Sequence, residues 1–115
     1  MAVRYFFSND QVLHIRGSTF EVFYQSLLEV IEENNIRLSR NLLRLVDDLE
    51  TGSYGIGCNI SDYIENKQDL LIFADLVKKA IRKFDSESPD LKQSVRKTFW
   101  DFHESLLKHA EELQE

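Results

Sequence analysis

Apolar residues recur at three- and four-residue intervals along residues 66–84, which is the pattern of one face of an α-helix. Asn66 is a candidate N-cap, because its side chain can accept a hydrogen bond from the first turn. Three further apolar residues, Leu71, Ile72 and Leu76, fall off this face. We therefore predict that this helix is central and that its first turns are covered on more than one side. The main face consists of Leu70, Phe73, Ala74, Val77, Ala80, Ile81 and Phe84.

The same periodicity predicts two helices earlier in the chain. Ser18 and Glu21 form a capping box, and apolar residues follow at helical spacing up to Asn34 and Asn35. Ser39 can cap the second helix, whose two sides differ in character. One side carries Leu42, Leu45, Val46 and Leu49, and the other carries Arg40, Arg44, Asp47 and Asp48. Both helices are therefore expected to pack one side against a core.

A long last helix is predicted from Ser88 and Pro89 onward, because proline at the first helical position loses no hydrogen bond. Its main apolar stripe consists of Leu91, Val95, Phe99, Phe102, Leu106, Ala110 and Leu113. A second stripe, formed by Trp100, His103 and Leu107, lies at the side. A helix with two apolar stripes is expected to pack against two surfaces. These are either the bundle and the N-terminal aromatic residues, or the bundle and a partner.

Two segments lack a helical pattern. The mostly apolar residues 5–7 and 12–15 flank the turn-prone residues 8–10, which predicts a short β-hairpin, with a helix as the alternative. Residues 51–61 hold three of the four glycines and show no apolar periodicity, which predicts a loop, followed by a short helical turn through residues 62–64. A loop of this length in a compact domain is more often functional than filler.

Together these elements predict a mainly α-helical protein that forms a single domain over residues 1–115. A short first connection, a long middle one and a short last one indicate a four-helix-type bundle made of two antiparallel helix hairpins. The N-terminal β-hairpin or extra helix carries many aromatic residues, so we expect it to cover one end of the bundle.

Charge narrows the range of partners. The net charge is −6, so nucleic acid is not expected as a direct partner, whereas a basic protein would be attracted. No apolar run approaches the ~20 residues that cross a bilayer, and no signal-peptide pattern follows Met1. We therefore expect no membrane contact and a cytoplasmic location. The single cysteine, Cys58, fits a reducing compartment.

The sequence offers no recognisable catalytic or metal-binding set. His103 and His109 are six residues apart, which is not the i, i+4 spacing of a zinc-binding helix. The glycines match neither a phosphate loop nor a dinucleotide-binding motif. We therefore expect no enzymatic activity and no bound cofactor or metal. The enzyme alternative is a small hydrolase that uses Cys58, and it requires a thiol that is alkylated rapidly near neutral pH.

The residues that suggest binding are acidic and aromatic, and they lie at the end of the second helix and around the glycine-rich segment. They are Asp47, Asp48, Glu50, Tyr54, Asp62, Tyr63 and Glu65. If the segment folds back, they form one acidic surface, in which tyrosine supplies contact area and the carboxylates orient a basic partner. The alternative is that the tyrosines belong to the core and the acids only favour solubility.

The order of these features resembles small immunity proteins of bacterial contact-dependent growth inhibition and related polymorphic toxin systems. The resemblance covers Leu45 to Ile81, and it is carried by an acidic helix end, the run DLETGSYGIG and the run ISDYIENKQDLLIFADLVKKAI. It implies a non-catalytic protein that binds and neutralises one cognate toxin domain, often a nuclease with a basic active site. The aromatic N-terminal segment has no counterpart in that family.

The resulting hypothesis is a cytoplasmic immunity protein that occupies the active-site cleft of a basic toxin, which we expect to be a nuclease. In this hypothesis the five acids Asp47, Asp48, Glu50, Asp62 and Glu65 take the place of substrate phosphates, and Tyr54 and Tyr63 anchor the contact. The alternative is a non-catalytic helical subunit or regulator that docks on a larger protein through Trp100, His103 and Leu107.

Overall fold

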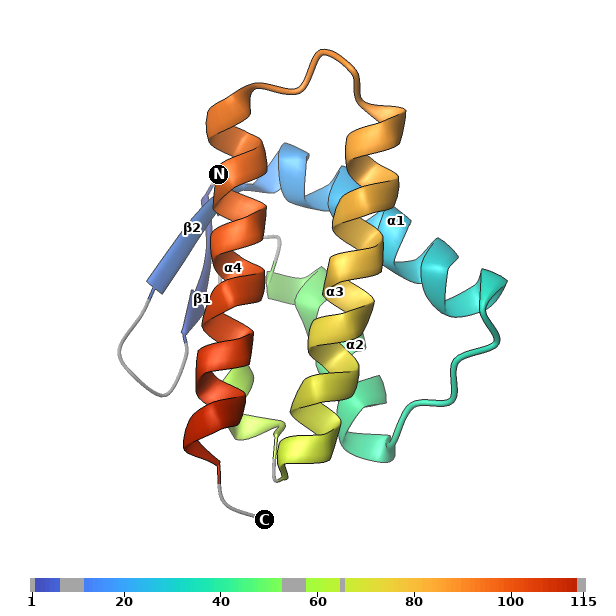
Figure 1. Ribbon diagram of the computed structural model, residues 1–115, viewed down its shortest axis with the longest axis vertical. Coiled ribbons are helices and arrows are strands. Elements are labelled where there is room, and N and C mark those ends of the chain that lie inside the picture. Colours follow the sequence, from blue (N-terminus) through green and yellow to red (C-terminus); the bar gives the residue numbers. More distant parts are fainter. Residues whose placement is uncertain (1, 7–11, 53–57, 65, 114–115) are drawn as a thin grey trace.

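The computed structural model describes residues 2–6, 12–52, 58–64 and 66–113. Within these ranges the chain forms four α-helices, three short strands and one turn of 3-10 helix (Figure 1). The helices are α1 (Gly17–Glu33), α2 (Arg40–Gly52), α3 (Lys67–Glu87) and α4 (Gln93–Glu112). The strands are β1 (Ala2–Phe6), β2 (Val12–Arg16) and β3 (Cys58–Asn59), and the 3-10 turn, η1, is Ile60–Asp62. The mainly helical fold class predicted from the sequence is confirmed.

Helix α3 is the central helix of the domain. It packs against both α1 and α4, and it runs antiparallel to α4 beside it (Figure 1). Asn66 caps α3 as predicted, because the backbone N–H of Asp69 donates a hydrogen bond to Oδ1 of Asn66 at 2.8 Å. The whole predicted apolar face is buried, and Leu76 is buried with it. In the first turns, however, Leu71 is 43% exposed and Ile72 is only half-buried, so the prediction that this part of the helix is covered on more than one side is wrong at Leu71.

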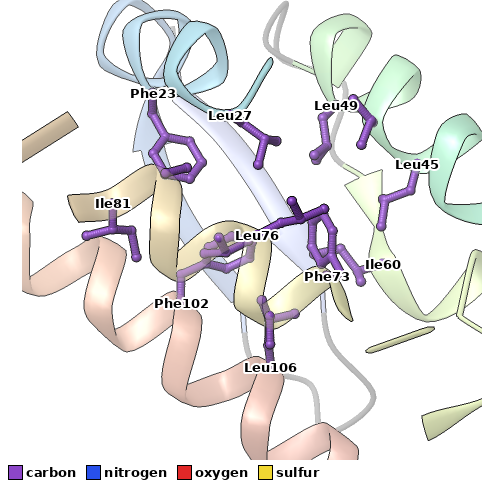
Figure 2. Close-up of a cluster of buried hydrophobic side chains, with 14 of the residues drawn as sticks. Phe23, Leu27, Leu45, Leu49, Ile60, Phe73, Leu76, Ile81, Phe102 and Leu106 are labelled. Carbon is purple, nitrogen blue, oxygen red and sulfur yellow. The ribbon is translucent and has the colours of Figure 1, made fainter. Parts of the chain in front are cut away.

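The core is one cluster to which all four helices contribute (Figure 2). Aromatic rings fill the junction of α1, α3 and α4. The ring of Phe23 stacks on that of Phe99 with centroids 4.6 Å apart, and Phe84 meets these two rings edge-on at 6.2 Å and 5.3 Å. Such aromatic pairs contribute about 0.5–1.5 kcal/mol beyond the area that they bury. The positions of α1 and α4 on α3 are therefore fixed by specific ring contacts as well as by burial.

The N-terminal segment adopts the β-hairpin, one of its two predicted alternatives. Strands β1 and β2 are antiparallel, with Ala2 opposite Arg16 and Phe6 opposite Val12. Strand β3 then pairs with β1 in parallel, which gives the strand order β2-β1-β3. The chain that follows α2 therefore returns to the N-terminal hairpin before α3 begins.

The prediction of a loop over residues 51–61 is wrong in part. Thr51 and Gly52 form the end of α2, and residues 58–62 form β3 and η1, while residues 53–57 lie outside the described ranges. A strand of two residues is too short to show an alternating pattern, and its hydrogen-bonding partner β1 lies far away in the sequence. No local signal could therefore have predicted β3.

The last helix begins later than the sequence predicted. Helix α4 starts at Gln93 without a side-chain cap, and Ser88 is instead the C-cap of α3. The residue before a proline avoids helical backbone angles, so the Ser88–Pro89 pair ends one helix here and does not start the next. An ion pair between Nε of Arg96 and Oδ1 of Asp85, at 2.5 Å, spans the connection between the two helices.

Candidate partner-binding surface

Helix α2 presents Asp47 and Asp48 on the side away from the core. The backbone N–H of Leu42 donates to Oγ of Ser39 at 3.2 Å, so Ser39 caps the helix as predicted. The predicted apolar side is buried, and it consists of Leu42, Leu45, Val46 and Leu49. Asp47 is exposed and Asp48 is half-buried. Packing of the apolar side therefore fixes the direction in which the two carboxylates point.

The charges of α2 run against its helix dipole. The base Arg40 lies in the first turn and the acid Glu50 in the last. Between them, the base Arg44 precedes the acids Asp47 and Asp48. A helix favours anions in its first turn and cations in its last, by about 0.3–1 kcal/mol per charge. Arginine four residues before aspartate, as in Arg44 and Asp48, is also the less favourable order for such a pair. The stability of α2 therefore does not explain where its charges lie.

A hydrogen bond joins the acidic part of α2 to the chain that follows the glycine-rich segment. The hydroxyl of Tyr63 donates to Oδ2 of Asp48. Ile60 and Ile64 flank Tyr63 in the sequence, and both are buried in the core. Asp62, which precedes Tyr63, is exposed. The structure thus brings Asp48 and Tyr63 into contact. Asp62, which precedes Tyr63 in the sequence, lies at the surface.

Arg44 belongs to the same surface, although the sequence had indicated only that it lies on the polar side of its helix. Its guanidinium carbon is 5.9 Å from the centroid of the Tyr63 ring, within the range of a cation–π contact. Tyr63 itself is half-buried and packs against the core cluster. Tyr63 therefore belongs in part to the core, its hydroxyl binds the carboxylate of Asp48, and its role in binding a partner stays a prediction.

Three predicted site residues cannot be placed in this surface. Tyr54 and Glu65 lie outside the described residues, and for Glu50 the structure describes the backbone in α2 but not the side chain. Their membership of the surface stays a prediction. The structure adds Leu43, which is 53% exposed one turn before Asp47. The signal that could have identified Leu43 is a large apolar residue on the polar side of an otherwise regular amphipathic helix.

The side stripe of α4 is largely covered by the protein itself. His103 is buried, and Trp100 and Leu107 are half-buried and pack against the core cluster. The rings of Trp100 and His103 meet edge-on, with centroids 5.8 Å apart. This internal packing leaves less of the stripe available to another protein, and docking through it stays a prediction.

Both histidines of α4 are packed inside the fold. Burial lowers the pKa of His103 and of His109, and for His109 the nearby Glu112 acts in the opposite direction. Nδ1 of His109 is buried and has no hydrogen-bond partner among the described residues. In the same part of the chain no group of three or more His, Cys, Asp and Glu side chains is arranged to hold a metal ion. The fold therefore favours the neutral form of both imidazoles.

Comparison with protein-family models, with curated protein sequences and with solved structures finds no match to this chain. Among the residues that the structure describes, no helix is both long enough and apolar enough to cross a bilayer. The function of the surface formed by Arg44, Asp47, Asp48, Asp62 and Tyr63, called here the α2 surface, is therefore argued from its own geometry and charge.

Proposed function

We propose that this chain is a non-catalytic immunity protein that binds a basic toxin domain and occludes its active site. The carboxylates of Asp47, Asp48 and Asp62 receive cationic side chains of the toxin, and Tyr63 supplies contact area. The toxin is expected to be a nuclease, because carboxylates can occupy the positions that substrate phosphates take in a basic cleft. Three residues predicted from the sequence, Glu50, Tyr54 and Glu65, extend this surface in the proposal.

The observation that carries the proposal is the gathering of acids at the C-terminal end of α2 beside Tyr63. A helix selected for stability alone would place acids in its first turn and bases in its last. Here the acids Asp47, Asp48 and Glu50 gather toward the C-terminal end, and α2 has no basic residue in its last turn. Helices α1 and α4 also end with acids, and what distinguishes the end of α2 is Tyr63, whose hydroxyl donates a hydrogen bond to Asp48. The excess of carboxylate at this end is what a cationic partner would select.

The hydrogen bond between Tyr63 and Asp48 supports the proposal from a second direction. It ties together two segments that are distant in sequence, and the buried side chains of Ile60 and Leu49 hold each segment in the core. A surface that is ordered before binding loses less conformational entropy when the partner arrives. Such preorganisation is useful to an inhibitor that must bind its target tightly and at once.

The proposal is tested by co-expression with the toxin domain encoded beside this chain. Cells that make the toxin domain alone should stop growing, and cells that also make this protein should grow. The two proteins should also co-purify as a stable complex. Cells that fail to grow, together with the absence of a complex, would contradict the proposal.

Charge-reversal variants show whether the α2 surface mediates the protection. The double variant Asp47→Lys with Asp62→Lys should lose the growth rescue, because it replaces two exposed carboxylates of this surface. The matched control is Glu104→Lys with Glu111→Lys, two exposed positions on α4 that change the net charge by the same amount. Equal loss of rescue in both variants would mean that net charge matters and the α2 surface does not.

A further inference from the structure

We infer that Tyr24 of α1 is a positioning residue for the α2 surface, because its hydroxyl fixes the turn of α2 that carries Asp47. Tyr24 is buried, and its hydroxyl donates a hydrogen bond to the main-chain carbonyl of Val46 at 2.9 Å. That carbonyl belongs to the planar peptide group that joins Val46 to Asp47. The inference rests on the proposed function for the role of the surface in binding, and it adds how that surface is held in place.

Neither the carbonyl nor the ring requires this hydrogen bond. Val46 lies in the interior of α2, where each main-chain carbonyl accepts a hydrogen bond from the N–H four residues later. The ring of Tyr24 stacks on that of Phe20 with centroids 6.1 Å apart, and phenylalanine would make the same contact. The hydroxyl adds direction, because a hydrogen bond needs a defined distance and angle, whereas apolar burial is non-directional.

Side-chain hydrogen bonds from three other parts of the fold hold α2. At its N-terminus, Oγ of Ser39 donates to Oδ2 of Asp69 on α3 at 3.1 Å. Near its other end, the hydroxyl of Tyr63 donates to Asp48. The bond from Tyr24 on α1 lies between them, and it is buried, whereas that of Ser39 is exposed and that of Tyr63 is partly buried. A hydrogen bond is stronger where water does not compete, so Tyr24 gives the firmest of the three restraints.

The two tyrosines act on the same turn of α2. Tyr24 binds the backbone of Val46, whose side chain is buried, and Tyr63 binds the half-buried carboxylate of Asp48. The exposed Asp47 lies between these two residues in the sequence. The direction in which its carboxylate meets a partner therefore depends on both hydroxyls. A surface held in this way loses less conformational entropy on binding, and differences in affinity between related complexes lie mostly in the dissociation rate.

Apolar packing alone would keep α2 folded without fixing it as closely. Leu42, Leu45 and Leu49 are buried in the core whether or not Tyr24 carries a hydroxyl. When specific contacts in a core are loosened, a protein loses its unique arrangement before it loses its stability. Removal of the hydroxyl should therefore leave the helix in place but less precisely oriented.

The first test uses the free protein. Tyr24→Phe removes the hydroxyl and keeps the ring. Residual dipolar couplings of the backbone N–H groups, measured by NMR on isotope-labelled protein, report the orientation of each helix. We expect the couplings of α1, α3 and α4 to match those of the wild type, and those of α2 to shrink because its orientation is averaged. Wild-type couplings throughout α2 would overturn the inference.

The second test uses the complex with the toxin domain encoded beside this chain. Tyr24→Phe should dissociate at least about tenfold faster than the wild type, while its association rate keeps the same dependence on salt. The matched control is Ile81→Val, at a buried position of α3, which should destabilise the protein by a similar amount. This control should dissociate at the wild-type rate. Equal acceleration in both variants would attribute the effect to lost stability and would overturn the inference.

The two tests separate this inference from the proposed function. If the wild type neither rescues growth nor forms a complex, the proposed function fails, and the couplings of α2 still decide whether Tyr24 orients the helix. If the wild type rescues growth and Tyr24→Phe dissociates as slowly as the wild type, the proposed function stands and Tyr24 is not a positioning residue.

Discussion

Helices α2 and α3 differ in how far their charges are paired within the protein. In α3 the acid Asp69 lies in the first turn, where the helix dipole favours it, beside the base Lys67, and the helix ends with the acids Asp85 and Glu87. Asp75 and Lys79 pair in the favoured order, with the acid first. In α2 the base Arg40 lies in the first turn and the acid Glu50 in the last. Several charges of α3 are therefore paired by the fold, whereas no ion pair among the described residues involves α2.

Lys83 is the charge of α3 with two ion-pair partners on another helix. Its ammonium group bridges Glu33 and Glu29 of α1, and hydrogen bonds to these two carboxylates raise its pKa to about 12. The pairing favours the charged form, so its contribution is complete at neutral pH and is lost only as the pH rises toward 12. Among the described residues, no carboxylate of α2 forms a comparable ion pair with another helix. The partner of the Asp48 carboxylate is the neutral hydroxyl of Tyr63.

The largest expected effect comes from breaking the scaffold itself. Phe73 of α3 is fully buried, so Phe73→Ala should lower the free energy of unfolding by about 3–5 kcal/mol. Urea denaturation followed by circular dichroism measures this change. Leu43→Ala, at an exposed position of α2, is the control and should change stability by less than about 0.5 kcal/mol. Similar losses for the two variants would contradict the division into scaffold and surface.

A smaller effect is expected at the contact between α2 and the segment around η1. Tyr63→Phe removes the hydroxyl that donates to Asp48 while it keeps the ring that packs on the core. The free energy of unfolding should fall by about 1 kcal/mol, because one partly buried hydrogen bond is lost. The double variant Tyr63→Phe with Asp48→Asn should lose hardly more than the single one. A fully additive loss would show that the two side chains are not coupled.

Exchanging charges in the two first turns tests the comparison directly. Arg40→Glu should stabilise the protein by about 0.5 kcal/mol, because it places an anion where the dipole of α2 favours one. Asp69→Lys should destabilise it by about 1 kcal/mol, since it reverses the favourable charge of α3 and removes the acceptor of Ser39. Both values are read from thermal or urea unfolding at low ionic strength. Effects of the same sign would refute the contrast between the helices.

The smallest expected effect is a dependence of stability on pH that originates in α4. Burial holds the pKa of His103 and of His109 below the ordinary value of 6.5, so the folded state favours the neutral rings. Stability should therefore be highest above pH 6.5 and should fall as the pH drops below it. Nearby carboxylates, among them Glu112, oppose the shift and keep the effect small. The double variant His103→Gln with His109→Gln should flatten the profile, and an unchanged slope would exclude the histidines as its source.

The sequence predicted those features that depend on neighbouring residues. The apolar face of α3 and the caps at Ser39 and Asn66 are confirmed, because helix periodicity and capping are local properties. The start of α4 was placed too early, because Ser88 and Pro89 are equally suited to ending the preceding helix. Here one local signal had two structural meanings.

Features that depend on tertiary contacts could not be predicted. Strand β3 is defined by its pairing with β1. The cation–π contact of Arg44 requires Tyr63, which comes close to Arg44 only because the chain between them returns to the hairpin. The sequence did group Asp48 with Tyr63, and the structure joins them by a hydrogen bond. The sequence did not indicate that Arg44 belongs to this group, because no local pattern marks a cation as part of a surface that is otherwise acidic.

The most direct test of the central claim is the association rate of this protein with the purified toxin domain, measured by stopped flow at increasing salt. The wild-type rate should fall as salt rises, and Asp47→Lys with Asp62→Lys should associate at least about tenfold more slowly at low salt. Glu104→Lys with Glu111→Lys should remain close to the wild type. A rate that ignores salt, or one that both double variants slow equally, would contradict the claim that the acidic end of α2 receives a basic partner.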